Sequence, residues 1–177
     1  PQGHGMRRVA ALDAHGERLS PHLVRVHLGG PAFNSFLDAA DPERLAMTDK
    51  YVKILFARPE LGLVPPYDFK VLRTELAADD LPVRRTYTVR SVYRESHTIA
   101  IDFVIHGDEG VAGPWAAGAQ TGDLLALSGP GGQYSPVDDP ESMHLLLGDD
   151  SAIPAIAAAL EAMPATASGL ALIEVEG

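Results

Sequence analysis

Short stretches of alternating hydrophobic and polar residues recur along the chain as far as residue 128. The alternation predicts strands over residues 8–14, 23–28, 50–57, 85–93, 98–106 and 124–128. In the fifth of these, Ile99, Ile101, Phe103 and Ile105 share one face of the strand. Residues 32–37 fit a short helical turn, and prolines and Gly62 predict irregular structure over residues 58–80. This part of the chain is predicted to be mainly β.

The pattern changes after residue 140. Residues 143–147 form a continuous apolar strand, as in a sheet buried on both faces, and residues 151–163 have helical spacing. With a further apolar strand at 170–175 they predict one βαβ unit, so we place a domain boundary between residues 1–138 and 139–177. Two parallel strands cannot cover both of their faces. We therefore expect a fragment of a longer protein, or else an appendage packed on the first domain.

Composition removes several classes of function. The chain has 24 acidic and 14 basic residues and a formal net charge of −10, which argues against non-specific nucleic-acid binding. The absence of cysteine excludes disulfides, thiol catalysis and Cys-ligated metals. No apolar run approaches the ~20 residues that span a bilayer, and no metal-ligand spacing occurs among the histidines. These features predict a cytoplasmic protein with no membrane insertion and no metal site.

Residues 85–90, Arg-Thr-Tyr-Thr-Val-Arg, carry candidate chemistry. On a strand, Arg85 and Tyr87 project to one face while Thr86 and Thr88 project to the other. An arginine fork suits a pyrophosphate, a tyrosine ring can stack on a flat heterocycle, and a threonine hydroxyl can bond a ring nitrogen. An ordinary strand with exposed arginines explains this hexapeptide equally well.

Residues 102–117 form the second candidate segment. A buried strand runs into a turn rich in small residues and then into a short helix that begins near Pro114. Glycines let a backbone approach a ligand closely, and free N–H groups at a helix start attract phosphate. A plain strand–turn–helix connection, with His106 bonded locally, is the alternative.

Taken together, these segments resemble one family. RTYTVR, then DFVIHGDEG followed by Ala112 and Trp115, then GDDS followed by IPA, is similar to the siderophore-interacting proteins, and KYVKILF at residues 50–56 also matches. These are FAD-dependent ferric-siderophore reductases of the ferredoxin-reductase-like superfamily. The resemblance implies a mainly β fold, in which an antiparallel Greek-key FAD-binding barrel precedes the first βαβ unit of an incomplete, NAD(P)H-binding-like α/β domain.

The resemblance also implies cofactor-binding residues on three segments. On the first, Arg85 would contact the FAD phosphates, Tyr87 would stack near the flavin, Thr88 would bond the isoalloxazine edge, and Thr86 adjoins them. On the second, Asp102, Phe103, Val104 and His106 would line the flavin pocket, Gly110, Val111 and Ala112 would offer N–H groups to the pyrophosphate, and Trp115 would anchor the helix or flank the adenine. On the third, Asp150 and Ser151 would face the flavin.

The implied function is reduction of ferric siderophores to release iron. Electrons would pass from NADPH, NADH or ferredoxin through FAD to Fe(III), with the chemistry centred on the flavin and no catalytic side chain required. An FAD oxidoreductase with another acceptor, or a non-enzymatic ligand-binding barrel, are the alternatives. An incomplete second domain would make the chain a poorly active fragment.

Overall fold

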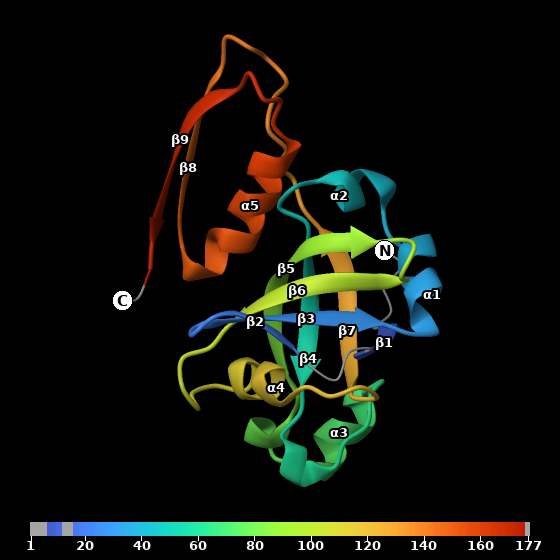
Figure 1. Ribbon diagram of the computed structural model, residues 1–177. Coiled ribbons are helices and arrows are strands. Elements are labelled where there is room, and N and C mark those ends of the chain that lie inside the picture. The colour runs from blue at the N-terminus through green and yellow to red at the C-terminus, as the bar shows by residue number, and fades with distance from the viewer. Residues whose placement is uncertain (1–6, 12–15, 176–177) are drawn as a thin grey trace.

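The computed structural model describes residues 7–11 and 16–175, and its main body is a closed antiparallel sheet (Figure 1). The strands of this sheet are β1 (Arg7–Ala11), β2 (Glu17–Ser20), β3 (Leu23–Gly29), β4 (Tyr51–Phe56), β5 (Val83–Tyr93), β6 (Thr98–Val104) and β7 (Leu124–Gly131). They follow the order β1-β7-β4-β5-β6-β3-β2, and an additional β1–β3 pairing closes the barrel. β4, β5 and β6 are consecutive neighbours and β7 returns beside β4, which is a Greek key.

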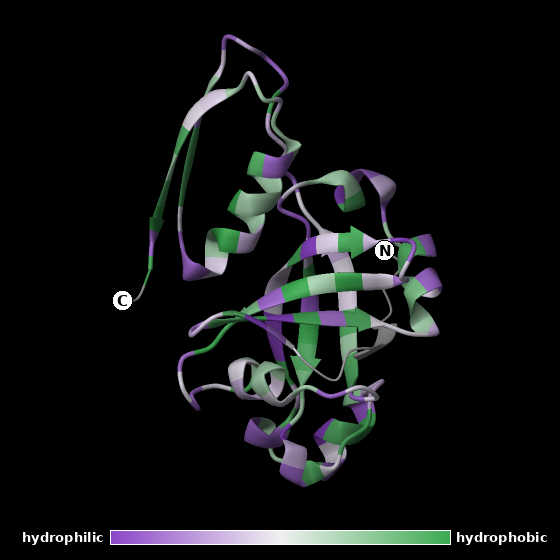
Figure 2. Ribbon diagram, viewed as in Figure 1, coloured by the Kyte–Doolittle hydropathy of each residue, from purple (hydrophilic) through white to green (hydrophobic). Residues whose placement is uncertain are grey.

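The barrel core follows from the alternation along its strands, visible as changing colours in Figure 2. Ile99, Ile101 and Phe103 of β6 are fully buried and share one face of the strand, because successive side chains point to opposite faces. Four short helices lie around the barrel (Figure 1): α1 (Ala32–Asp38), α2 (Pro42–Ala46), α3 (Phe69–Glu75) and α4 (Ala112–Gly118). Two short 3-10 turns, η1 (Pro59–Leu61) and η2 (Ala78–Asp80), complete the elements of the barrel, and a third, η3 (Asp150–Ala152), belongs to the second unit.

The second unit consists of β8 (Met143–Asp149), α5 (Ile153–Ala162) and β9 (Ser168–Glu174), with β8 and β9 parallel. Helix α5 lies between this strand pair and the barrel, where it packs against β5 (Figure 1). The expectation that residues 143–147 are buried on both faces is wrong. Met143, Leu145 and Leu147 are 58–74% exposed, because α5 covers only the opposite face.

Other differences from the predicted elements concern short segments. The stretch predicted as irregular contains α3, which begins where the Asp68 side chain accepts hydrogen bonds from the N–H groups of Lys70 and Val71. Two short elements were not predicted: residues 17–20 form β2, and α2 begins after its N-cap Asp41. The predicted strand at 8–14 is observed as β1 for residues 7–11, and residues 12–14 lie outside the described part.

Candidate functional site

The site predicted from the sequence lies where β5 and β6 separate. The two strands pair only between Val89–Tyr93 and Thr98–Ile101, with a register shift after Val89. Residues 83–88 pair with β4 on their other side, and residues 102–104 pair with β3. Residues 83–88 of β5 and residues 102–104 of β6 form no backbone ladder with each other. The N–H and C=O groups on the edges that face each other are therefore not used in β5–β6 hydrogen bonds. Seven of the predicted residues, 85–88 and 102–104, line this open edge.

The guanidinium of Arg85 is exposed at this edge and forms no ion pair with the described residues. Its side chain is exposed, and its guanidinium donates to the carbonyl oxygen of Arg84 at 3.0 Å. Among the described residues, the ion pairs involve Arg25, Arg44, Arg58 and Arg90 but not Arg85. An exposed guanidinium without a carboxylate partner is suited to bind phosphate oxygens.

Tyr87 lies over the aromatic part of the core. Its ring centroid is 4.5 Å from that of Phe103, and the Phe103 ring is 5.8 Å from that of Trp115. Burial raises the pKa of the Tyr87 hydroxyl, while the charge of Arg85 opposes this shift. The half-buried Tyr87 ring can meet a planar ligand, whereas the Phe103 side chain is fully buried and belongs to the core. Any contact of Phe103 with a cofactor would therefore come from its main chain.

Asp102 forms an ion pair with Arg25, a partner 77 residues away that was not predicted. Its carboxylate accepts two hydrogen bonds from Arg25, at 2.6 and 2.9 Å, and Asp102 is only 4% exposed. The hydrogen bond to Asp102 raises the pKa of Arg25 despite the opposing effect of burial. The strand register places Arg25 directly opposite Asp102. The carboxylate thus stabilises the barrel wall, and β6 can offer its main chain at this position.

A second ion pair joins the barrel to α5. Arg90 of β5 donates two hydrogen bonds to the carboxylate of Glu161, one of them at 2.8 Å. The hydrogen bond from Arg90 lowers the pKa of Glu161. The Arg90 side chain is 12% exposed and that of Glu161 is 64% exposed, so water screens the pair on one side.

This pair gives a pH-dependent prediction. Because the folded-state pKa of Glu161 is lowered, its contribution is present above the unfolded pKa of about 4.3 and is lost as pH falls through the folded value. Glu161→Gln should therefore lower the free energy of unfolding by less than about 1 kcal/mol at neutral pH. In urea titrations of both proteins, this difference should shrink at about pH 3. A difference that is equal at both pH values would contradict the assignment.

A cleft brings the barrel and the second unit together. It has a volume of about 380 Å³ and is lined by Val104, His106, Asp149, Asp150, Ser151, Glu174 and Val175. Four of these were predicted from the sequence, although they lie on segments more than 40 residues apart. Asp149 organises the turn, because its carboxylate accepts hydrogen bonds from the Ser151 N–H at 3.0 Å and hydroxyl at 2.6 Å. These bonds lower the pKa of Asp149.

The loop that leaves β6 provides the remaining predicted residues. Gly107 and Gly110 have φ angles of 56° and 73°, in the left-handed region that favours glycine. The loop ends at Val111, which is the N-cap residue of α4. Among the described residues, no side chain accepts a hydrogen bond from the first N–H groups of this helix. Val111 is half-buried and Ala112 is buried, which leaves their main chain as the part available to a ligand.

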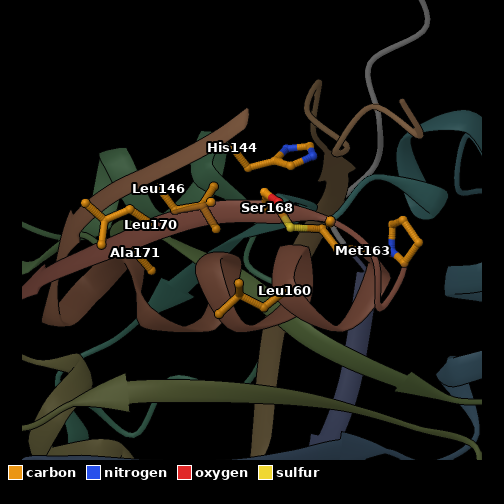
Figure 3. Close-up of a pocket in the computed structure, with 10 residues that line it drawn as sticks. His144, Leu146, Leu160, Met163, Ser168, Leu170 and Ala171 are labelled. Atoms are coloured by element: carbon orange, nitrogen blue, oxygen red, sulfur yellow. The ribbon is translucent and has the colours of Figure 1, made fainter. Parts of the chain in front are cut away.

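A further pocket, drawn in Figure 3, lies between α5 and the strand pair β8–β9. Its volume is about 240 Å³, and His144, Leu146, Leu160, Met163 and Ser168 are among its lining residues. His144 is at the amino end of β8, whereas Asp149 is at the carboxyl end. None of the predicted cofactor-binding residues lines this pocket, so it is separate from the cleft above.

Two kinds of feature are not found in the described residues. In residues 7–11 and 16–175, no three His, Asp or Glu side chains are grouped so as to hold a metal ion. Every helix in the same range is too short or too polar to cross a membrane.

Comparison with known proteins first defines the class of fold. A solved siderophore utilization protein from T. fusca superimposes with a TM-score of 0.74 at 33% identity, and the match covers 98% of this chain and 62% of that one. The fold is thus the FAD-binding, ferredoxin-reductase-like fold, and the predicted fold class is confirmed.

The family follows from the sequence matches. Residues 14–134 match the siderophore-interacting FAD-binding domain, and residues 141–177 match the siderophore-interacting protein family. The chain belongs to this family, so the predicted family and its FAD cofactor are confirmed.

An uncharacterized protein of Mycobacterium tuberculosis H37Rv is 48% identical over 90% of this chain and 54% of its own length. The ferric vibriobactin reductase of Vibrio cholerae O395 is 37% identical over 89% of this chain and 55% of its own. The chain spans about half the length of these relatives.

Proposed function

We propose that this chain binds FAD between β5 and β6 and serves the reduction of ferric siderophores. In this proposal residues 1–138 are the FAD-binding barrel and residues 139–177 begin an NAD(P)H-binding-like domain. The 37% identity to a ferric vibriobactin reductase supports a ferric chelate as substrate. The observation that carries the proposal is the cleft in which Val104 and His106 of the barrel face Asp150 and Ser151 of the second unit.

The residues along the open edge fit FAD in their chemistry. The exposed guanidinium of Arg85 would bind phosphate oxygens, and the N–H groups of Gly110, Val111 and Ala112 would donate to the same phosphates. Tyr87 would stack on the flavin, while the hydroxyl of Thr88 and that of the neighbouring Thr86 would donate to its polar edge. Trp115 would hold α4 against the barrel, since its ring packs on both Phe56 and Phe103.

The redox chemistry would come from the FAD ring, which can accept two electrons as a hydride from NADPH or NADH, or one electron from each of two ferredoxins, and can release them singly to Fe(III). The protein's own contribution is to bind and orient. Main-chain groups of Asp102, Phe103 and Val104 would fix the ring along β6, and the turn held by Asp149 would position Asp150 and Ser151 above it. No acid–base side chain is required for electron transfer to the metal.

A second groove supports docking of an anionic chelate close to this edge. It has a volume of about 440 Å³ on the outer side of β4 and β7, and Asp41, Arg44 and Lys53 are among its lining residues. Asp41 pairs with Arg44 at 3.8 Å, so the attraction for an anion would come from Lys53. Lys53 lies directly opposite Thr86 in the β4–β5 register, and its side chain is exposed. A cationic side chain next to the proposed flavin site would attract an acidic siderophore in a chain that is otherwise acidic.

The test compares two adjacent arginines. Arg85→Ala should raise the dissociation constant for FAD about 10–100-fold, because charge-assisted hydrogen bonds to phosphate contribute roughly 1.5–3 kcal/mol. Arg84→Ala is the matched control, since Arg84 is equally exposed but projects to the opposite face of β5. The readout is the visible flavin spectrum of the purified chain after FAD is added and the excess is removed.

The result separates the alternatives. Flavin bands that persist in the wild type and in Arg84→Ala, but weaken in Arg85→Ala and in Thr88→Ala, support the proposal. Reduction of a ferric siderophore with NADPH or NADH is then followed through a ferrous-specific chelator. A chain that retains no FAD at all overturns the proposal and leaves the ligand-binding barrel.

A further inference from the structure

A β-bulge in β5 directs Arg90 out of the barrel and toward α5. From Val89 to Ser91 the strand advances by two residues while its partner β6 advances by one, so Arg90 is the extra residue. Val89 is buried in the core, whereas the Arg90 guanidinium donates two hydrogen bonds to the carboxylate of Glu161. Bulges re-aim side chains and are frequent beside active sites. This one gives β5 a side chain that binds the second unit, two residues after Thr88 of the proposed flavin site.

The two ends of this ion pair differ in their freedom to move. The Arg90 side chain is 12% exposed, and the hydrogen bond to Glu161 raises its pKa despite the opposing effect of burial. A guanidinium that is mostly enclosed by the barrel has few other orientations. Glu161 is 64% exposed and lies in the last turn of α5. The pair therefore fixes where the end of α5 lies on the barrel.

Helix α5 connects this pair to the cleft at its other end. From Ser151 to Glu161 the chain advances about 15 Å, at ~1.5 Å per residue. The helix packs against β5, and the turn η3 before it packs against β6 (Figure 1). Gly148 lets this turn lie directly on β8, because a Cβ at Gly148 would overlap that of Ala152. A short helix moves as a rigid body, so the position of Glu161 on the barrel sets the position of Asp150 and Ser151 at the cleft.

We infer that Glu161 is a positioning residue for the proposed flavin site, acting through Arg90 and α5. The inference rests on the proposed function, because it requires the flavin to lie where β5 and β6 separate. The pair would keep the turn of Asp150 and Ser151 against the barrel, and water would be excluded from that side of the flavin. Without the pair the cleft would open, while the contacts of the barrel with FAD would remain.

The experiment measures how accessible the bound flavin is to a small neutral molecule. The chain is saturated with FAD, and its flavin fluorescence is quenched with acrylamide. Glu161→Arg sets two cations against each other and should raise the quenching constant at least ~2-fold. The dissociation constant for FAD should change less than ~3-fold, because Arg85 and Thr88 are on the barrel. Glu161→Gln keeps one acceptor and should give a smaller rise in the quenching constant, in the same direction.

Asp80→Arg is the matched control, because it makes the same change of charge in the Arg58–Asp80 pair, in which neither residue belongs to α5. It should leave the quenching constant unchanged. A rise in Glu161→Arg and Glu161→Gln but not in Asp80→Arg supports the inference, and Glu161→Gln alone decides it if Glu161→Arg does not fold.

The contrary results are distinct from one another. A wild-type quenching constant in a folded Glu161 variant overturns the inference while flavin binding stands, since a pair that only stabilises the chain would not change access to the flavin. Loss of FAD from a folded Glu161→Gln also overturns it, because the pair would then be required for binding. Failure of the wild type to retain FAD overturns the proposed function, and this inference with it.

Discussion

Asp102→Ala is expected to lower the free energy of unfolding by about 3 kcal/mol, because it leaves Arg25 as a charge without its partner. Arg25 donates two hydrogen bonds to this carboxylate, and the side chains are 19% and 2% exposed. The pair joins β3 and β6 in the barrel wall. We therefore expect the lost stability to appear in the unfolding of the whole barrel and not in local opening. Urea unfolding at neutral pH measures the difference.

Two controls show whether burial of the pair is the cause. Asp80→Ala breaks the Arg58–Asp80 pair, in which Arg58 is 55% exposed, and should cost less than about 1 kcal/mol. The double variant Arg25→Leu with Asp102→Leu removes both charges and should be more stable than Asp102→Ala, since no unpaired charge remains. If Asp102→Ala is as mild as Asp80→Ala, the ion pair does not stabilise the barrel as described.

Alternation along the chain was sufficient to predict most of the barrel. β3, β4, β5 and β6 lie within a few residues of their predicted positions. The hydrophobic residues that alternate along them, such as Ile99, Ile101 and Phe103 in β6, do enter the core, although the other face of β6 is buried too. Elements whose formation depends on a single side chain were missed. Helix α3 is the example: its start is fixed by the carboxylate of Asp68 in a stretch dominated by prolines, and local hydrophobic periodicity carries little information there.

The ion-pair partners of the charged residues could not be predicted from the neighbouring sequence. Arg25 and Asp102 are 77 residues apart in the sequence and meet only through the register of β3 and β6. Arg90 meets Glu161 only because α5 packs on β5. Any signal for these pairs would have to come from predicting which strands are neighbours, since nothing near either residue specifies its partner.

The sequence predicted the segments that carry the candidate site but not the shape of the cleft that they form. The predicted residues include 85–88, 102–104, 106 and 150–151, and a cleft does contain Val104, His106, Asp150 and Ser151 together. A groove lined by Phe56, Tyr67, Trp115 and Leu124, among other residues, could not be predicted in the same way. Its walls come from β4, the segment around Tyr67, α4 and β7, which are brought together only when the barrel closes.

Phe103→Ala is expected to lower the free energy of unfolding by about 3–5 kcal/mol, through lost burial and the cavity that remains. The Phe103 ring is fully buried and contacts the rings of Phe56, Tyr87 and Trp115. Phe103→Leu, which keeps most of the volume, should cost less than half as much. Thermal and urea unfolding, followed through Trp115 fluorescence, measure both variants.

The same strand offers the comparison that separates core from cofactor contact. Val104, the next residue of β6, is half-buried and lines the cleft, so Val104→Ala should cost about 1 kcal/mol of stability at most while weakening FAD binding several-fold. Phe103→Leu should retain the FAD affinity of the wild type, because only the main chain at residue 103 faces the open edge. If Phe103→Leu instead loses FAD while remaining folded, the Phe103 side chain is a direct cofactor contact and its assignment to the core is wrong.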